Sequence, residues 1–234
     1  MIIKHNFEDI SFSPWVKLDI SNWEGIINKG STIKYKKNSI IFQEQQNLLS
    51  VYIIKSGRIR LTVSNKDGDE KHIMIAEVGC IIGESSCLLN VPSMTAATTI
   101  VNTEMYEISK SDFLKYININ KELNKLIMSI ISIKNNIFIQ QISDLSFSSS
   151  IERVSKALYD LANLYGVKYG NSYRINIKFT HQDIANLINC SRVTVSKIFS
   201  QLLDDKIIER KNGYIIVNDL EQIKELIAMD KILL

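Results

Sequence analysis

The sequence of 234 residues is poor in cysteine and histidine and contains no long apolar run. Its three cysteines, Cys80, Cys87 and Cys190, are odd in number and far apart, which fits neither a disulfide framework nor a four-ligand zinc site. No stretch approaches the roughly 18 uncharged apolar residues that a membrane span requires. The first residues, up to Trp15, show no secretory signal pattern. We therefore expect a cytoplasmic protein with reduced thiols, no metal site and no membrane contact.

Groups that could carry out catalysis are equally scarce. The three histidines, His5, His72 and His181, form no obvious triad with other residues. The stretch "GESSC", which begins at Gly83, lacks the second glycine of a nucleophile elbow. The sequence therefore does not predict an enzyme.

The chain is long enough for two domains, each with its own hydrophobic core. The formal net charge is only +3, but the charge is unevenly distributed. Residues 174–213 contain seven Lys or Arg against four Asp or Glu, which accounts for the whole excess. The positive charge is thus concentrated in the carboxyl-terminal part of the chain.

Residues 31–108 consist of short alternating apolar segments separated by turn signals. Ser56-Gly57 interrupts one such segment, Asp67-Gly68 separates two alternating runs as in a hairpin, and Gly79 marks a further turn. Short, evenly spaced strands without a long helix between them predict a compact β-roll or barrel. We assign residues 1–110 to this first domain.

A long helix is predicted from about residue 111 to 146, where Gly and Pro are absent. One stripe has the 4-3-4-3-4 spacing of a coiled-coil seam and contains Ile119, Leu123, Leu126, Ile130, Ile133 and Ile137. A neighbouring stripe contains Ile127, Ile131, Phe138 and Ile142. We expect one face to cover the β-roll and the other to contact a second copy of the chain. The expected dimer interface is Leu123, Leu126, Ile130, Ile133 and Ile137; the alternative is a helix buried within its own monomer.

The polar run "SFSSS", residues 146–150, is suited to a hinge, so residues 111–148 are assigned to a dimerisation helix and hinge. Further on, Thr180 and Asp183 form a helix-start signal, Asn189 tolerates the left-handed conformation that ends a helix, and Ser191 can cap the next helix. The inward face of that next helix carries Val195, Ile198, Phe199 and Leu202. Its outward face near the amino end carries Arg192, Val193, Ser196 and Lys197. This pattern predicts a helix-turn-helix.

The segment "KIIERKNGYIIV" places Asn212-Gly213, a type I′ turn pair, between two apolar runs. It predicts a small hairpin, or wing, with Arg210 and Lys211 near its tip. Such a wing contacts phosphates while the second helix occupies the major groove. Residues 149–234 are therefore assigned to a DNA-binding domain. The alternative is a ligand-binding regulatory module that acts through protein partners, but the cations around Arg192 favour DNA.

The chain as a whole is assigned to the α+β class. A β-roll (a double-stranded β-helix of the jelly-roll type), a long helix and a winged helix-turn-helix in this order resemble the CRP/FNR family of bacterial transcription regulators. The segments "YIIKSGRIRL", "KDGDEK" and "VGCIIGES" resemble the family's effector-domain turns, and "HQDIANLINCSRVTVSKI" resembles its DNA-reading segment. The resemblance implies a homodimer that binds a palindromic operator on double-stranded DNA and contacts RNA polymerase if it activates transcription. It also implies allosteric control by a small molecule or redox signal in the first domain.

The resemblance further implies roles for individual residues. Base-reading positions are matched by Arg192, Val193, Ser196 and Lys197, and phosphate-contacting positions by Thr180, His181, Gln182, Ser191, Thr194 and Lys211. Many members carry Glu where this chain has Val193, whose side chain can contact a thymine methyl but cannot accept a hydrogen bond from cytosine. The operator is therefore expected to differ from the family's best-known half-site.

The effector positions implied by the resemblance are Gly83, Glu84, Met94, Thr95 and Lys134. Gly83-Glu84 matches the pair whose Glu takes the ribose of a cyclic nucleotide, but Met94-Thr95 stands where an Arg-Ser pair holds the phosphate. A buried phosphate without its positive partner would be poorly compensated. Cyclic AMP in the usual mode is therefore not expected, and no cofactor is predicted.

Other signals find equally little support. The iron-sulfur branch needs a cysteine cluster near the amino terminus, and none precedes Cys80. His72 is more typical of an exposed strand histidine than of a haem ligand. Cys80 and Cys87 could form a thiol switch, but two buried thiols are the commoner arrangement. The run "VTVS" resembles the branch that senses halogenated phenols, which would place an aromatic anion near Lys134; the alternative is a solvated lysine beside the seam. The effector stays unassigned.

Overall fold

The computed structural model describes residues 13–228 and divides the chain into two units. The N-terminal unit extends to Phe138, and the C-terminal unit begins at Ile139. Residues 1–12 and 229–234 are the outer ends of the predicted first and last domains and lie outside the described part. The stretch without a signal pattern, with His5, falls largely in the first of these segments.

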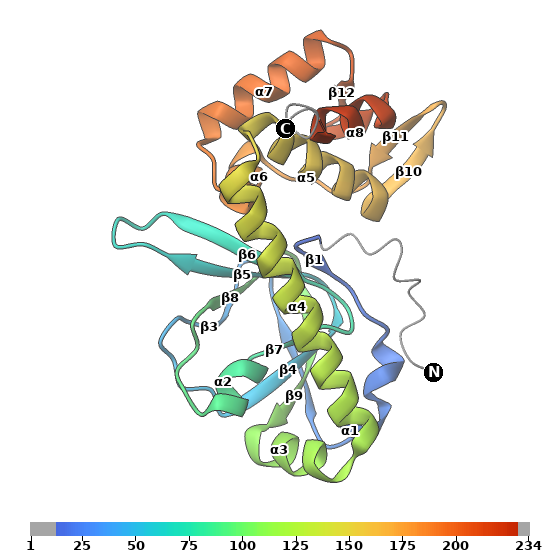
Figure 1. Cartoon of the computed structure of the whole chain (residues 1–234). Coiled ribbons are helices and arrows are strands. Elements are labelled where there is room, and N and C mark those ends of the chain that lie inside the picture. The colour runs from blue at the N-terminus through green and yellow to red at the C-terminus, as the bar shows by residue number, and fades with distance from the viewer. Residues whose placement is uncertain (1–12, 229–234) are drawn as a thin grey trace. The chain divides into compact units, whose positions relative to one another are not determined.

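The N-terminal unit is built from two sheets (Figure 1), with the strand orders β1-β6-β5-β8-β3 and β2-β9-β4-β7. The first sheet contains β1 (Trp15–Val16), β3 (Ile40–Phe42), β5 (Ile59–Ser64), β6 (Glu70–Ala76) and β8 (Ala96–Thr99). The second contains β2 (Ser31–Tyr35), β4 (Ser50–Ser56), β7 (Ile81–Ile82) and β9 (Thr103–Ser109). Short helical segments are η2 (Ile20–Trp23), α1 (Glu24–Ile27) and α2 (Glu84–Leu89). The predicted β-roll is confirmed.

The turns of the β-roll lie where the sequence predicts them. β5 and β6 form an antiparallel hairpin around Asp67-Gly68, in which Gly68 has a φ of 85°. The Oδ1 atom of Asn65 accepts hydrogen bonds from the amides of Asp67 and Asp69 at 3.0 and 2.9 Å. These local bonds explain why the turn could be identified from residue types alone.

The core of the N-terminal unit is closed around Trp23, which is fully buried. Its Nε1 donates a hydrogen bond of 2.7 Å to the carbonyl of Gly79. Gly79 has a φ of 77°, and a Cβ at this position would lie 2.3 Å from the carbonyl oxygen of Leu18. Glycine is therefore required here both by conformation and by space.

The predicted long helix is two helices, α3 (Lys110–Ile119) and α4 (Lys121–Phe147). Asn120, with φ −110° and ψ 104°, breaks the helix, and its Oδ1 accepts a hydrogen bond of 3.0 Å from the amide of Leu123. Ile119, which the sequence assigned to the seam, lies on α3 and is 69% exposed. The single-helix prediction was wrong because apolar spacing continues across a break that a side-chain cap stabilises.

α4 has two apolar faces, as predicted. Most residues of the predicted seam, however, lie on the face that packs against the β-roll. The buried face carries Leu123, Ile127, Ile130, Lys134 and Ile137, which belong to or adjoin the β-roll core. Leu126 and Ile133 lie at its edge and are partly buried. Leu123, Ile130 and Ile137 therefore have almost no surface left for a partner chain, and assigning them to a dimer interface was wrong. The exposed stripe includes Met128, Ile131 and Phe138.

The C-terminal unit continues the chain from the last turns of α4. α5 (Ser150–Tyr165) begins with a capping box between Ser149 and Glu152. It is followed by β10 (Gly166–Tyr169), β11 (Ser172–Ile175), α6 (His181–Ile188), α7 (Arg192–Asp204), β12 (Ile208–Lys211), β13 (Tyr214–Val217) and α8 (Leu220–Ala228). The strands form one antiparallel sheet of order β10-β11-β13-β12. Within residues 13–228, no helix is both long enough and apolar enough to cross a membrane.

Candidate DNA-reading surface and sensor site

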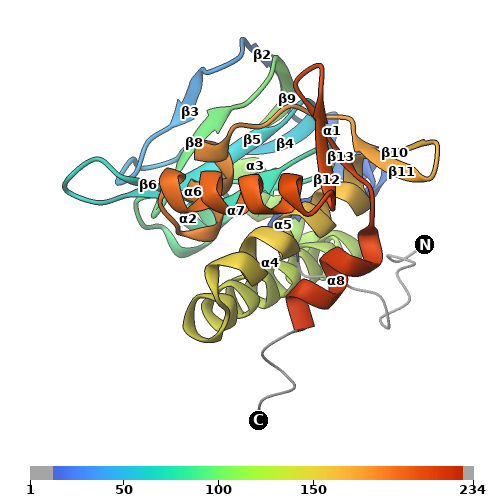
Figure 2. The same ribbon diagram turned by 90° about the horizontal axis from the view of Figure 1, so that it is seen from above.

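Helices α6 and α7 form the helix-turn-helix (Figure 2), and side-chain caps set their ends. Thr180 Oγ1 accepts a hydrogen bond from the amide of Asp183 at 3.1 Å, and Asp183 Oδ2 accepts one from the amide of Thr180 at 2.8 Å. Asn189 ends α6 with a φ of 55°, and Ser191 Oγ begins α7 by accepting a hydrogen bond from the amide of Thr194 at 3.0 Å. Each of these residues has the role that the sequence predicts for it.

The amino end of α7 presents an exposed face of mixed chemistry. The residues predicted to face inward, Val195, Ile198, Phe199 and Leu202, are all buried. Arg192, Val193 and Lys197 are exposed, Val193 to 63%. Three of the four predicted base-reading side chains thus reach solvent from the first turns of the helix. They combine two cations with one apolar group, which suits the edges of bases in a major groove.

Ser196, the fourth predicted base-reading residue, is half-buried and bonded within the unit. Its Oγ lies 2.8 Å from Nδ1 of His181, whose ring packs against Phe199 with the centroids 4.6 Å apart. Burial, followed by repulsion from Arg210 and Arg192, lowers the pKa of His181 below its usual range. Above that pKa the imidazole is neutral, so at neutral pH His181 lacks the positive charge assumed for a phosphate contact. Its visible role is to position Ser196.

Four of the other predicted phosphate contacts lie at the amino ends of the two helices. Thr180, Gln182 and Ser191 are exposed, and Thr194 is partly exposed. Ser191 and Thr194 also share a hydrogen bond of 2.8 Å between their hydroxyl groups. Helix amino ends carry partial positive charge and unpaired amides, which favour an anion.

The wing is the hairpin of β12 and β13. Asn212 and Gly213 have φ values of 53° and 79°, as a type I′ turn requires. Lys211, which faces Tyr214 across the strands, donates a hydrogen bond of 3.0 Å to the hydroxyl of Tyr169 on β10. This hydrogen bond is the main reason why the pKa of Lys211 is raised, so the lysine keeps its charge. The sequence did not reveal this contact, because Tyr169 is 42 residues away.

Lys134 is not a solvated lysine: it is 6% exposed and points into the β-roll. Its Nζ lies 2.8 Å from Glu84 Oε1 and 2.8 Å from the carbonyl oxygen of Ile81. Desolvation is the largest single influence and lowers the pKa of Lys134, but attraction to Glu84 and Cys80 and the hydrogen bond to Glu84 together outweigh it, and the net shift is upward. Lys134 therefore keeps its charge, and its contact with Glu84 links α4 to the segment where β7 leads into α2. The expectation of a solvated lysine was wrong because the sequence could not show a partner 50 residues away.

The remaining effector positions are Gly83, which adjoins Glu84 in the chain, and Met94 and Thr95. Gly83 precedes α2 in a left-handed conformation, with a φ of 82°. The side chain of Met94 is 72% exposed, and Thr95 is partly exposed on the loop before β8. His72, expected to be exposed, is 4% exposed.

The two cysteines of the β-roll are buried, as expected. Burial raises the pKa of Cys80 to about 11 and also raises that of Cys87. Both thiols therefore stay protonated near neutral pH, which makes them poor nucleophiles. Within residues 13–228 no group of His, Cys, Asp and Glu is arranged to hold a metal ion.

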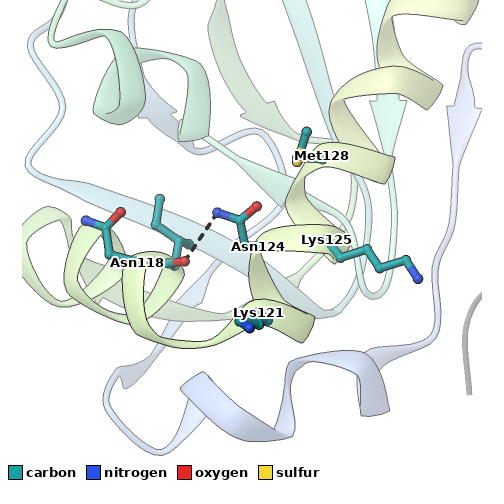
Figure 3. A pocket seen from close by; sticks show the side chains of 6 residues that line it. Asn118, Lys121, Asn124, Lys125 and Met128 are labelled. Carbon is teal, nitrogen blue, oxygen red and sulfur yellow. Dashed lines mark hydrogen bonds between the residues drawn. The ribbon is translucent and has the colours of Figure 1, made fainter.

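A shallow surface pocket lies elsewhere, at the junction of α3 and α4 (Figure 3). It is lined by Ile117, Asn118, Lys121, Asn124, Lys125 and Met128. Asn124 Nδ2 donates a hydrogen bond of 3.3 Å to the carbonyl of Ile117, which closes the corner between the helices. Lys121 and Lys125 point in different directions, so they do not form one anion site. None of the predicted effector residues lines this pocket.

Comparison with known proteins assigns a family to each part. A model described as "Cyclic nucleotide-binding domain" matches residues 32–120, and one described as "Crp-like helix-turn-helix domain" matches residues 152–226. Fold and site together define a DNA-binding regulator with a ligand-binding type of β-roll. The chain belongs to the CRP/FNR family of transcription regulators.

Curated relatives are distant in sequence but cover most of the chain. The chain is 24% identical over 191 residues to the CRP-like cAMP-activated global transcriptional regulator of Mycobacterium tuberculosis (strain CDC 1551 / Oshkosh), covering 82% of this chain and 85% of the relative. It is 26% identical over 187 residues to the Anaerobic regulatory protein of Bacillus subtilis (strain 168), covering 80% of this chain and 76% of the relative.

Solved structures share the fold. A structure of OCPA-complexed CprK has a TM-score of 0.71 at 20% identity and covers 91% of this chain and 98% of its own. A CooA mutant from Carboxydothermus hydrogenoformans has a TM-score of 0.74 at 20% identity and covers 86% of this chain and 89% of its own.

Proposed function

We propose that the chain is a homodimeric regulator that reads a palindromic operator through α7 and responds to a signal in the β-roll. The observation that carries this proposal is the exposed face of α7, where Arg192, Val193 and Lys197 project together. Arg192 and Lys197 can donate to guanine, and Val193 can contact a thymine methyl. Ser196, held by His181, completes the base-reading set. Thr180, Gln182, Ser191, Thr194 and Lys211 would contact phosphates on either side.

This function divides the chain into three parts. Residues 1–110 would sense the signal, residues 111–148 would dimerise and transmit it, and residues 149–234 would bind DNA. We place the activity in the cytoplasm, with RNA polymerase as a partner where transcription is activated. The class of regulator follows from the family, whereas these finer assignments are our proposal.

We infer that the dimer forms through the exposed face of α4 and not through the predicted seam. Asn124, Met128, Ile131, Asn135 and Phe138 follow a 4-3-4-3 spacing, and all five are exposed. The apolar members are 65%, 41% and 38% exposed for Met128, Ile131 and Phe138. Water disfavours such a stripe, and a second copy of the same helix would cover it. A two-fold axis along this helix would match a palindromic operator.

The effector is proposed to act at Lys134 and Glu84. Glu84, which would have to take the ribose of a cyclic nucleotide, is occupied by Lys134. Met94 supplies no positive charge for a phosphate. Cyclic AMP in the usual mode therefore lacks both partners. A negatively charged effector could replace Glu84 beside Lys134 without leaving a buried ammonium unpaired.

The test is selection of operator sequences from a random DNA library by the full chain, followed by binding measurements over a range of salt concentrations. We expect palindromic sites with half-site centres about 10 base pairs apart and an affinity that falls steeply with salt. Arg192→Ala should cost roughly 1–3 kcal/mol and relax the preference at one base position, whereas Lys211→Ala should weaken all sequences alike. Lys224→Ala, on the exposed side of α8, is the control and should change neither property. Failure to enrich any sequence, with or without candidate effectors, would refute the proposed function.

A further inference from the structure

Two cations converge on one aromatic ring beside the wing. Arg174 lies on β11, and Lys178 lies in the segment before α6. The guanidinium carbon of Arg174 is 5.4 Å from the ring centroid of Tyr214, and Nζ of Lys178 is 5.2 Å from it. Tyr214 opens β13 directly after the turn residue Gly213. Three separate segments of the chain therefore supply this cluster.

The cluster contains positive charge without a matching negative charge. Within residues 13–228, neither Arg174 nor Lys178 forms an ion pair with a carboxylate. The guanidinium of Arg174 donates a long hydrogen bond of 3.3 Å to Asn176 Oδ1, and its Nε has no acceptor. The face of an aromatic ring attracts cations but does not neutralise them. Two like charges on one ring repel each other, and an anion between them would remove that repulsion.

The cluster also lies between two segments already assigned to phosphates. Lys178 precedes Thr180, the cap of α6, by two residues. A Cβ on Gly213 would lie 3.7 Å from Lys178 Cε, so the lysine stem lies against the tip of the wing. Lys211 faces Tyr214 across β12 and β13, which places it on the same face of the sheet as the ring. Lys178 therefore joins the wing to the amino end of α6 in one cationic surface.

We propose that Arg174 and Lys178, held by Tyr214, form an additional clamp for the phosphate backbone of DNA beside the bases that α7 reads. The inference rests on the proposed DNA-binding function and extends it to residues outside the helix-turn-helix. Phosphodiester oxygens accept hydrogen bonds from guanidinium and ammonium groups, and their negative charge attracts both. Phosphate contacts do not depend on base sequence, so such a clamp would increase the affinity for operator and random duplexes alike.

The test compares the wild type with Arg174→Gln/Lys178→Gln on a selected operator and on a random duplex of equal length, over a range of salt concentrations. The logarithm of affinity should depend less steeply on the logarithm of salt, by about 0.9 for each phosphate that each protomer no longer neutralises. The change should be the same for both duplexes, and the preferred bases should stay the same. Tyr214→Leu should reproduce part of this loss, and Tyr214→Phe, which keeps the ring, should not.

Lys168→Gln is the matched control, because Lys168 is exposed on the same sheet but pairs with Tyr173, on the face opposite to Arg174. It should leave the salt dependence unchanged. An unaltered slope in the double variant, with normal operator preference, would overturn the clamp and leave the proposed function standing. An equal loss in Lys168→Gln would also overturn it, because only general charge would then matter. A wild type that prefers no operator refutes the proposed function, and one that also binds no random duplex refutes both.

Discussion

Replacing one member of the ion pair between Lys134 and Glu84 should destabilise the β-roll strongly, whereas replacing both should not. The two side chains are only 8% and 5% exposed, and Nζ and Oε1 are 2.8 Å apart. Lys134→Met leaves the carboxylate in the core without its cation, and Glu84→Leu leaves the ammonium. Loss of one partner from a buried pair costs about 3–5 kcal/mol. For a chain of this size that corresponds to a fall in Tm of roughly 6–20 °C.

The double variant Glu84→Leu/Lys134→Met provides the comparison that isolates the pair. Apolar replacement of both members is often neutral or stabilising, so its stability should equal or exceed that of the wild type. Urea unfolding followed by circular dichroism at pH 7 measures all four proteins and gives the coupling energy. Because the folded pKa of Lys134 is raised, the lysine's contribution is complete below its ordinary pKa of about 10.4 and is lost as the pH rises through the folded value. If each single variant had a free energy of unfolding within about 1 kcal/mol of the wild-type value, the pair would not be buried. Exposed ion pairs contribute no more than that to stability.

Two further predictions concern the dimer and the imidazole. Phe138→Glu should shift the protein from dimer to monomer in sedimentation, because it places a charge in the exposed stripe of α4. Ile119→Glu, at a position on α3 that is more exposed still, should not. A dimer that survives Phe138→Glu would place the interface elsewhere. Any step that His181 contributes to the pH dependence of DNA affinity should lie below about pH 6.5, because its pKa is lowered from that ordinary value. His181→Ala should weaken base preference through Ser196. A step above pH 6.5 that disappears in His181→Ala would contradict this.

The helix-turn-helix could be predicted from sequence because its determinants are local. Thr180 and Ser191 accept hydrogen bonds from amides three residues away, and Asn189 donates its own amide to a carbonyl four residues back. The buried positions follow a single helical period. The Asp67-Gly68 hairpin is predictable for the same reason. Propensity and spacing are sufficient where the stabilising contacts are between near neighbours.

The orientation of α4 could not be predicted, because its sequence carries two apolar stripes and spacing alone does not say which one meets the β-roll. Burial of Ile130 and exposure of Ile131 depend on which stripe meets the β-roll, and the β-roll contacts come from distant residues. The charge on Lys134 made its stripe look less buried than it is. The burial of Lys134 is explained only by its contact with Glu84, which lies 50 residues away in the sequence.

The position of Lys134 on α4 bears on how far a rotation of this helix would move its exposed stripe. Lys134 and Phe138 are one turn apart on the same helix, but the first is buried and the second is exposed. If the proposed effector displaced the ammonium of Lys134, α4 would have to turn about its axis. Side chains extend about 5–6 Å from that axis, so a rotation of about 20° would move the exposed stripe by roughly 2 Å. A partner helix packed on that stripe would have to follow, and the contact between the two protomers would shift with it.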